Sequence, residues 1–155
     1  MTVSIRIQAE GFDIAVETAA LTKGRTDIGA IVTFSGLCRD EGGRLAALEL
    51  EHYPGMAEAE VKRVVDEALS RWPLSGVTVI HRFGTVRPGQ NIVLTITASA
   101  HRGAAFAAGE FLMDYLKTRA PFWKREHLKD GTTGPWVEAR GEDDDAAERW
   151  RTDRA

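Results

Sequence analysis

The 155-residue sequence is poor in cysteine and lacks several common functional motifs. Its single cysteine, Cys38, excludes an internal disulfide and fits a reducing, cytoplasmic setting. No apolar run approaches the ~20 residues needed to cross a bilayer, and the N-terminus shows no signal-peptide pattern. The nucleotide-binding patterns G-x-G-x-x-G and G-x-x-x-x-G-K-[ST] are absent, as is the G-x-S-x-G of many hydrolases. The four histidines show no paired ligand spacing, which argues against a structural zinc.

The amino-acid composition is that of a single globular domain. Hydrophobic residues make up 43% and charged residues 28%, and the formal net charge is -3. A mildly acidic total argues against a general nucleic-acid binder. We predict one domain over residues 1–141, followed by a charged tail over 142–155 that frays or is ordered by a partner.

The apolar pattern predicts a mixture of strands and segregated helices. Strands are predicted for "VSIRIQ", "GAIVTFSG", "LAALELEHY", "VTVIHRFGTV" and "NIVLTITASA", and "FWKREHL" with "PWVEAR" predicts a closing hairpin. Helices are predicted for "FDIAVETAALT", "PGMAEAEVKRVVDEALSRW" and "GAAFAAGEFLMDYLKT". Consecutive strands joined by turns favour an α+β fold over a doubly wound parallel sheet.

Cations gather in the last third of the chain. Residues 101–125 contain five Lys or Arg against two acids. His101 and Arg102 stand where a predicted strand passes into a helix, a position where backbone N–H groups and an arginine bind phosphate or carboxylate groups. The same residues also suit an ordinary polar loop.

Lys117 and Lys124 are the residues best suited to chemistry. Lys117 at the end of a helix has a plain explanation, because a cation there interacts favourably with the helix dipole. However, Lys124 and Arg125 follow closely, and a lysine held near other cations becomes a candidate base or nucleophile. Arg39 follows a buried strand into a glycine-rich loop, where a solvated surface arginine is the alternative. A lone cysteine is more often a small buried apolar residue than a nucleophile, and Cys38 is interpreted so.

Long segments of the sequence resemble the large, catalytic subunit of molybdopterin synthase, the MoaE family. They are "LEHYPGMAEAE", "RWPLSGVTVIHRFG", "SAHRGAAFAAGEFLMDYLKTRAPFWKRE" and "WVEAR", and the similarity runs from about Gly29 to Arg140. The resemblance implies an α/β hammerhead fold with an antiparallel β subdomain. It also implies a homodimer that binds a small ubiquitin-like subunit at each end, a heterotetramer overall.

The implied reaction inserts two sulfurs into cyclic pyranopterin monophosphate, or precursor Z, forming the dithiolene of molybdopterin. Sulfur arrives as a thiocarboxylate on the Gly-Gly C-terminus of the small subunit. No cofactor or metal is implied, because the pterin is the substrate. By resemblance, Lys117 and Lys124 are catalytic, and His101 and Arg102 come from the neighbouring protomer. The implied substrate contacts are Leu37, Cys38, Arg39, His101, Arg102, Lys117, Lys124, Arg125, Glu126 and Arg140.

Two other functions remain open at this stage. An RNA-binding module would need an extended basic surface, against which the acidic total argues. A non-catalytic scaffold that binds a ubiquitin-like sulfur carrier would need the docking groove but neither Lys117 nor Lys124.

Overall fold

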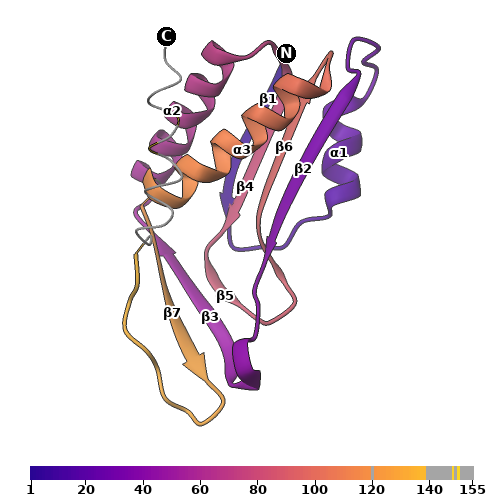
Figure 1. Cartoon of the computed structure of the whole chain (residues 1–155). Coiled ribbons are helices and arrows are strands. Elements are labelled where there is room, and N and C mark those ends of the chain that lie inside the picture. Colours follow the sequence, from indigo (N-terminus) through magenta and orange to yellow (C-terminus); the bar gives the residue numbers. More distant parts are fainter. Residues whose placement is uncertain (120, 139–147, 149, 151–155) are drawn as a thin grey trace.

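A computed structural model describes residues 1–119, 121–138, 148 and 150. The elements in chain order are β1 (Thr2–Gln8), α1 (Ile14–Thr22), β2 (Ala30–Leu37), the 3-10 turn η1 (Glu41–Gly43), β3 (Leu45–His52), α2 (Met56–Arg71), β4 (Leu74–Arg82), β5 (Gly84–Val86), β6 (Asn91–Ser99), α3 (Arg102–Arg119) and β7 (Phe122–Leu128). The predicted α+β class is confirmed, and Figure 1 shows helices and strands gathered into two unequal parts.

The larger part is a four-stranded sheet covered by helices on both faces (Figure 1). Its strand order is β1-β4-β6-β2, in which β1 pairs with β4 in parallel and the other pairs are antiparallel. Helices α2 and α3 pack on one face around Val77, Val79 and Phe111. Helix α1 covers the other face, where Leu21 contacts a cluster containing Ile80. This alternation along β4 is what a strand buried on both faces requires.

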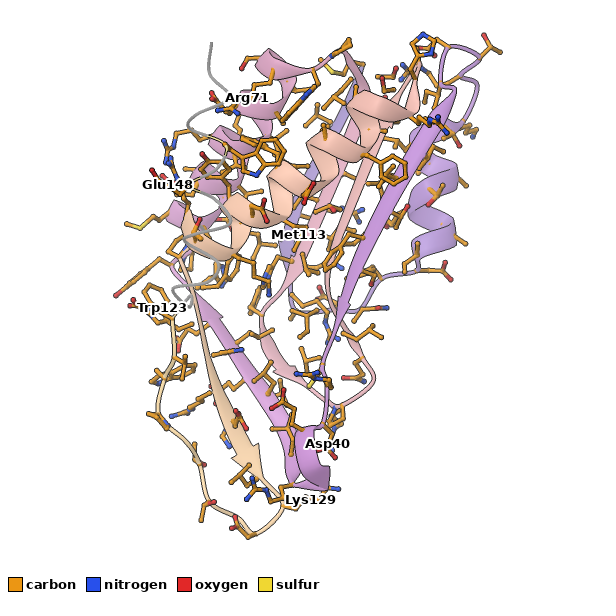
Figure 2. The ribbon with its side chains drawn as sticks, viewed as in Figure 1. Asp40, Arg71, Met113, Trp123, Lys129 and Glu148 are labelled. Atoms are coloured by element: carbon orange, nitrogen blue, oxygen red, sulfur yellow. The ribbon has the colours of Figure 1, made fainter. Side chains whose placement is uncertain are left out.

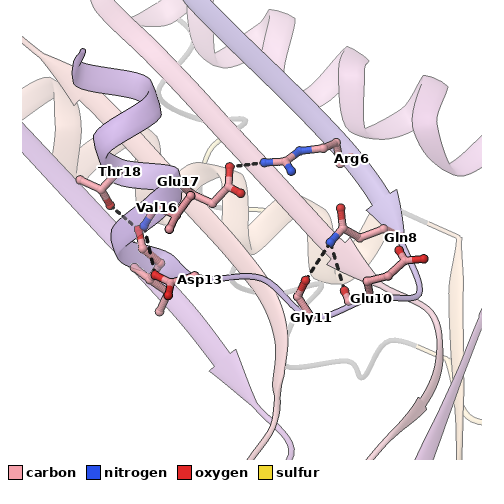
Figure 3. Close-up of polar contacts among 9 residues, drawn as sticks. Arg6, Gln8, Glu10, Gly11, Asp13, Val16, Glu17 and Thr18 are labelled. Atoms are coloured by element: carbon pink, nitrogen blue, oxygen red, sulfur yellow. Dashed lines mark hydrogen bonds and ion pairs between the residues drawn. The ribbon is translucent and has the colours of Figure 1, made fainter.

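Polar contacts fix α1 against the neighbouring strand and loop (Figure 3). The Asp13 carboxylate accepts a hydrogen bond from the Val16 backbone N–H at 3.1 Å and so caps the helix. Glu17 of the first turn forms an ion pair with Arg6 of β1. The Gln8 side chain donates to the carbonyl oxygens of Glu10 and Gly11, at 3.1 and 3.2 Å. These contacts order the loop that joins β1 to α1.

The smaller part is a three-stranded antiparallel sheet of order β5-β3-β7. One face carries its own small core, made of Cys38, Leu45, Leu48, Leu50 and Val86. Its strands come from three distant parts of the sequence, and in Figure 1 it extends below the helix-covered sheet. β7 follows α3 directly, so the end of α3 lies where the two sheets meet.

Two sequence predictions differ from the structure. "VTVIHRFGTV" is not one strand, because β4 ends at Arg82 and β5 begins at Gly84, and the two belong to different sheets. Gly84 has a φ of 85°, a conformation that redirects the chain and that glycine adopts without strain. The first strand of the expected hairpin forms as β7, and the described part of the second, with the turn before it, joins β7 through isolated bridges, Lys124 to Val137 and His127 to Thr133.

Trp150 packs into the main core although it lies in the predicted charged tail. Its side chain is 9% exposed, and its indole meets Trp72 and Phe111 edge-on, at 5.7 and 5.6 Å between centroids. The indole N–H donates to Asp114 at 2.6 Å, and Arg71 on α2 donates to the Trp150 carbonyl at 3.0 Å (Figure 2 labels Arg71). The predicted boundary at residues 141 and 142 lies outside the described residues.

Candidate active site

Lys117 lies where the two sheets meet. It belongs to the last turn of α3, and β7 begins five residues later at Phe122. The Phe122 ring stacks on His81 of β4, with 3.7 Å between centroids and 12° between planes. Burial is the main cause that lowers the pKa of His81 to about 4, and the Lys117 charge lowers it further. The Lys117 ammonium group therefore lies within electrostatic reach of the His81 ring.

Lys124 sits on the core side of β7. It pairs with Leu50 of β3, so the two side chains share the face that carries the small core. Cys38 is buried on this face, and burial raises the pKa of its thiol. Asp40 and Glu126 raise that pKa further, while Lys124 lowers it. The loop after β2 thus lies within electrostatic reach of Lys124 and Glu126.

Two exposed residues stand here, Leu37 at the end of β2 and Arg39 in the loop that follows. Leu37 is 56% exposed, and Arg39 forms an ion pair with Glu41 at the surface. Exposed ion pairs contribute little, so a ligand can recruit this guanidinium at small cost. Both backbone polar groups of Cys38 form hydrogen bonds within the protein. Its N–H donates to the Gln90 carbonyl at 2.9 Å, and its carbonyl accepts from the Gly89 N–H at 2.7 Å.

Arg125 points away from Lys124. Its Nε donates to Glu49 at 2.9 Å, and its guanidinium lies 4.4 Å above the Trp136 ring. His127 also contacts Glu49, at 2.8 Å, and these two hydrogen bonds, that from His127 first, lower the Glu49 pKa. Arg125 therefore has a structural pairing on the outer face of the small sheet.

A hollow of about 210 Å³ runs beside the β7 edge. It is lined by Lys124, Arg125, Glu126, Leu128, Gly134, Pro135 and Val137. Three residues predicted for the site thus border one concave surface. Arg140, another predicted substrate contact, lies outside the described residues.

His101 and Arg102 stand at the opposite end of α3 from Lys117. Both are exposed, and Arg102 is the first residue of the helix. Fifteen residues separate Arg102 from Lys117, which at ~1.5 Å per residue is about 22 Å along the helix axis. One chain therefore does not bring these two groups into one small-molecule site.

His81 is the site residue that sequence reasoning missed. Its Nδ1 lies 2.8 Å from the Arg82 carbonyl, so Nδ1 carries the proton and Nε2 keeps its lone pair. His52 approaches from β3, with its ring 6.1 Å from Phe122 and 4.7 Å from Phe83. The alternation in "VTVIHRFG" places His81 on a strand, but nothing in the sequence indicates that Phe122 will stack on it.

We expect His81 to make stability fall with acidity. The pKa is 6.5 for a free histidine and about 4 in the folded protein, so between these values the unfolded chain binds more protons. Stability is full above pH 6.5 and drops by about 3 kcal/mol as the pH falls to 4. A His81→Gln variant should lack this loss in urea unfolding measured from pH 8 to pH 4. Above pH 7, its plot of unfolding free energy against pH should run parallel to the plot for the parent. Parallel plots down to pH 4 would contradict the lowered pKa of His81.

Within the part of the chain that the structure describes, no three His, Cys, Asp or Glu side chains gather closely enough to hold a metal ion. In the same residues, every helix is too short or too polar to pass through a membrane.

Comparisons with known proteins match nearly the whole chain. The family model described as MoaE protein matches residues 7–119. A molybdopterin synthase catalytic subunit from Mesorhizobium japonicum is 66% identical, over 96% of this chain and 94% of the relative. The solved structure of a molybdopterin biosynthesis MoaE protein from Burkholderia ambifaria is 48% identical with a TM-score of 0.83, covering 97% of this chain and 99% of that one. A molybdopterin synthase structure from Staphylococcus aureus is 29% identical with a TM-score of 0.76, covering 84% and 94%.

Proposed function

Since the chain belongs to the MoaE protein family, we propose that it is the catalytic subunit of a molybdopterin synthase and acts as a sulfurtransferase. The observation that carries the proposal is the junction of the two sheets, where Lys117 acts electrostatically on the uncharged His81 and Lys124 follows on β7. The proposed substrate is cyclic pyranopterin monophosphate. The proposed sulfur donor is the thiocarboxylate at the Gly-Gly C-terminus of a small ubiquitin-like subunit.

Each group in the proposed site has a role that its chemistry supports. Arg39 and Arg102 bind the cyclic phosphate, because guanidinium groups form paired hydrogen bonds with phosphate oxygens. Lys117 moves a proton as the thiocarboxylate sulfur attacks the pterin side chain. Lys124 stabilises the negative charge that develops there. Leu37, Cys38, Arg125, Glu126 and Arg140 remain predicted substrate contacts.

A second copy of the chain supplies His101 and Arg102 in this proposal. The distance along α3 supports it, since one chain cannot bring Arg102 to its own Lys117. The exposed edge of the larger sheet supports it too: β2 is an edge strand, and Ile31 and Phe34 on it are 38% and 42% exposed. Phe106, one turn beyond Arg102, is 62% exposed. Large apolar side chains along a free edge are typical of an interface.

The proposed assembly is a homodimer with one small subunit at each end, a heterotetramer. A cytoplasmic location, which suits a thiocarboxylate donor and a buried free thiol, stays a prediction from the sequence.

The decisive experiment combines the purified chain, the thiocarboxylated small subunit and cyclic pyranopterin monophosphate. We expect molybdopterin, detected as its fluorescent oxidation product, only when all three are present. The control is the same small subunit ending in an ordinary carboxylate, which should give no product. A chain that binds the small subunit but forms no molybdopterin would be the non-catalytic scaffold instead.

A further inference from the structure

A second concave surface lies beside the outer face of the small sheet. It is a pocket of about 360 Å³, lined by Glu51, His52, Tyr53, Trp123 and Trp136, and named here the aromatic pocket. Figure 2 shows Trp123 at the outside of the molecule, near the start of β7. Because side chains alternate along a strand, Trp123 and Lys124 point to opposite faces of β7. The Trp123 wall of the aromatic pocket therefore faces away from Lys124, while His52, which also lines the pocket, lies toward the Phe122 ring.

The aromatic rings form walls at right angles. The Tyr53 and Trp123 rings are 5.2 Å apart between centroids, with 85° between their planes. Trp123 is held in place, because its indole N–H donates to Glu138 at 2.7 Å. Tyr53 is 59% exposed and Trp136 is 39% exposed. Large aromatic groups at a surface are typical of residues that contribute most to protein–protein binding.

The charges around these rings are negative. Glu51 is exposed, lies opposite Trp123 on β3, and has no ion pair within residues 1–119 and 121–138. Glu138 adds a second carboxylate at the Trp123 indole. Arg125, on the same face of the small sheet, forms an ion pair with Glu49. Such a surface repels an anionic pterin phosphate, and it attracts a cation on electrostatic grounds.

Ring faces and carboxylates together select a particular chemistry. A cation is attracted to the face of an aromatic ring, and most strongly to tryptophan. The protein already shows this preference here, since Arg125 lies 4.4 Å above one side of Trp136. A neutral aromatic ligand would gain from the rings but nothing from Glu51.

We propose that the aromatic pocket binds a lysine or arginine side chain of a partner protein that docks on the outer face of the small sheet. The inference goes beyond the proposed function, which assigns no role to any residue that lines the aromatic pocket. Its test uses no part of the sulfur-transfer reaction, so it stands or falls independently of the synthase activity.

The test follows the four tryptophan indole N–H signals in an NMR titration of the whole chain with N-acetyl-arginine amide. We expect the signals of Trp123 and Trp136 to shift, and those of Trp72 and Trp150, which pack in the main core, to stay in place. N-acetyl-citrulline amide, a neutral compound of the same shape, is the matched probe and should shift neither pair. Equal shifts with both compounds, or shifts of all four indoles, would overturn the proposal.

Two variants separate the contribution of the Glu51 charge to binding from that of the Trp123 ring. Glu51→Gln should weaken arginine amide binding about 3-fold, the size expected for one surface ion pair. Trp123→Ala should weaken it roughly 10-fold, through loss of the ring face. Glu10→Gln removes an exposed carboxylate near the larger sheet and should leave binding unchanged. If Trp123→Ala fails to fold, Glu51→Gln still decides, since unchanged binding in that variant contradicts the proposed role of the charge.

Discussion

Replacing Lys117 with alanine is expected to lower molybdopterin formation by roughly 10²- to 10⁴-fold, the usual contribution of a positioned proton-transfer group. The last turn of α3 holds this lysine within electrostatic reach of His81, whose ring is fixed by the Arg82 carbonyl and by stacking on Phe122. No other lysine of the described residues is an interaction partner of that ring. The measurement is single-turnover formation of molybdopterin with thiocarboxylated small subunit.

Two further variants make the Lys117 result specific. Lys117→Arg keeps the positive charge but cannot give up a proton, so we expect it to be nearly as inactive as Lys117→Ala. Lys62→Ala removes an exposed lysine of α2 that pairs with Asp66, and it should keep parental activity. Near-normal turnover by Lys117→Ala would remove this residue from the mechanism. High activity of Lys117→Arg would show that only the charge is needed.

Mixing two inactive variants is expected to restore activity. Arg102→Ala should be inactive because the cyclic phosphate loses a guanidinium partner, and Lys117→Ala because proton transfer fails. After the two are unfolded together and refolded, half of the dimers contain one chain of each kind. In each such dimer one site has both its own Lys117 and the other chain's Arg102. Random pairing therefore gives about a quarter of parental activity.

The matched control for this experiment mixes Lys117→Ala with Lys124→Ala. Both lysines belong to the same chain's site, so neither site of the mixed dimer is intact and activity should stay absent. Restoration in this control, or none in the first mixture, would contradict a site built from two chains. Binding of the cyclic phosphate by Arg102→Ala as tightly as by the parent would contradict the role of Arg102.

The sequence predicts well whatever depends on local periodicity. The apolar repeat in "GAAFAAGEFLMDYLKT" predicts burial of Ala108, Phe111, Leu112, Tyr115 and Leu116, and all five are in the buried set of α3. In α2 the predicted apolar face is Val61, Val64, Val65, Ala68, Leu69 and Trp72. The first four are buried, and Leu69 and Trp72 are partly buried against the same core. The long matching segments also identified the family correctly. A repeat of 3.6 residues is a property of one segment, so no knowledge of its neighbours is needed.

The structural features that the sequence does not predict depend on contacts between distant segments. The His81 stack joins residues 41 positions apart, and the aromatic pocket combines β3, β7 and Trp136. β4 and β5 are separate strands because each pairs within a different sheet. Local strand propensity does not indicate which sheet a segment will join. Trp150 is buried by α2 and α3 although its surroundings in the sequence are charged.

The 18-residue span of α3 limits how the chain can change in length. In the proposed dimer this helix carries part of its own site at Lys117 and part of the other chain's site at Arg102. Inserting one residue within it would turn one end against the other by about 100° and lengthen it by about 1.5 Å, damaging both sites at once. Related sequences should therefore gain and lose residues around residues 39–44 and 129–135, while α3 keeps a constant length.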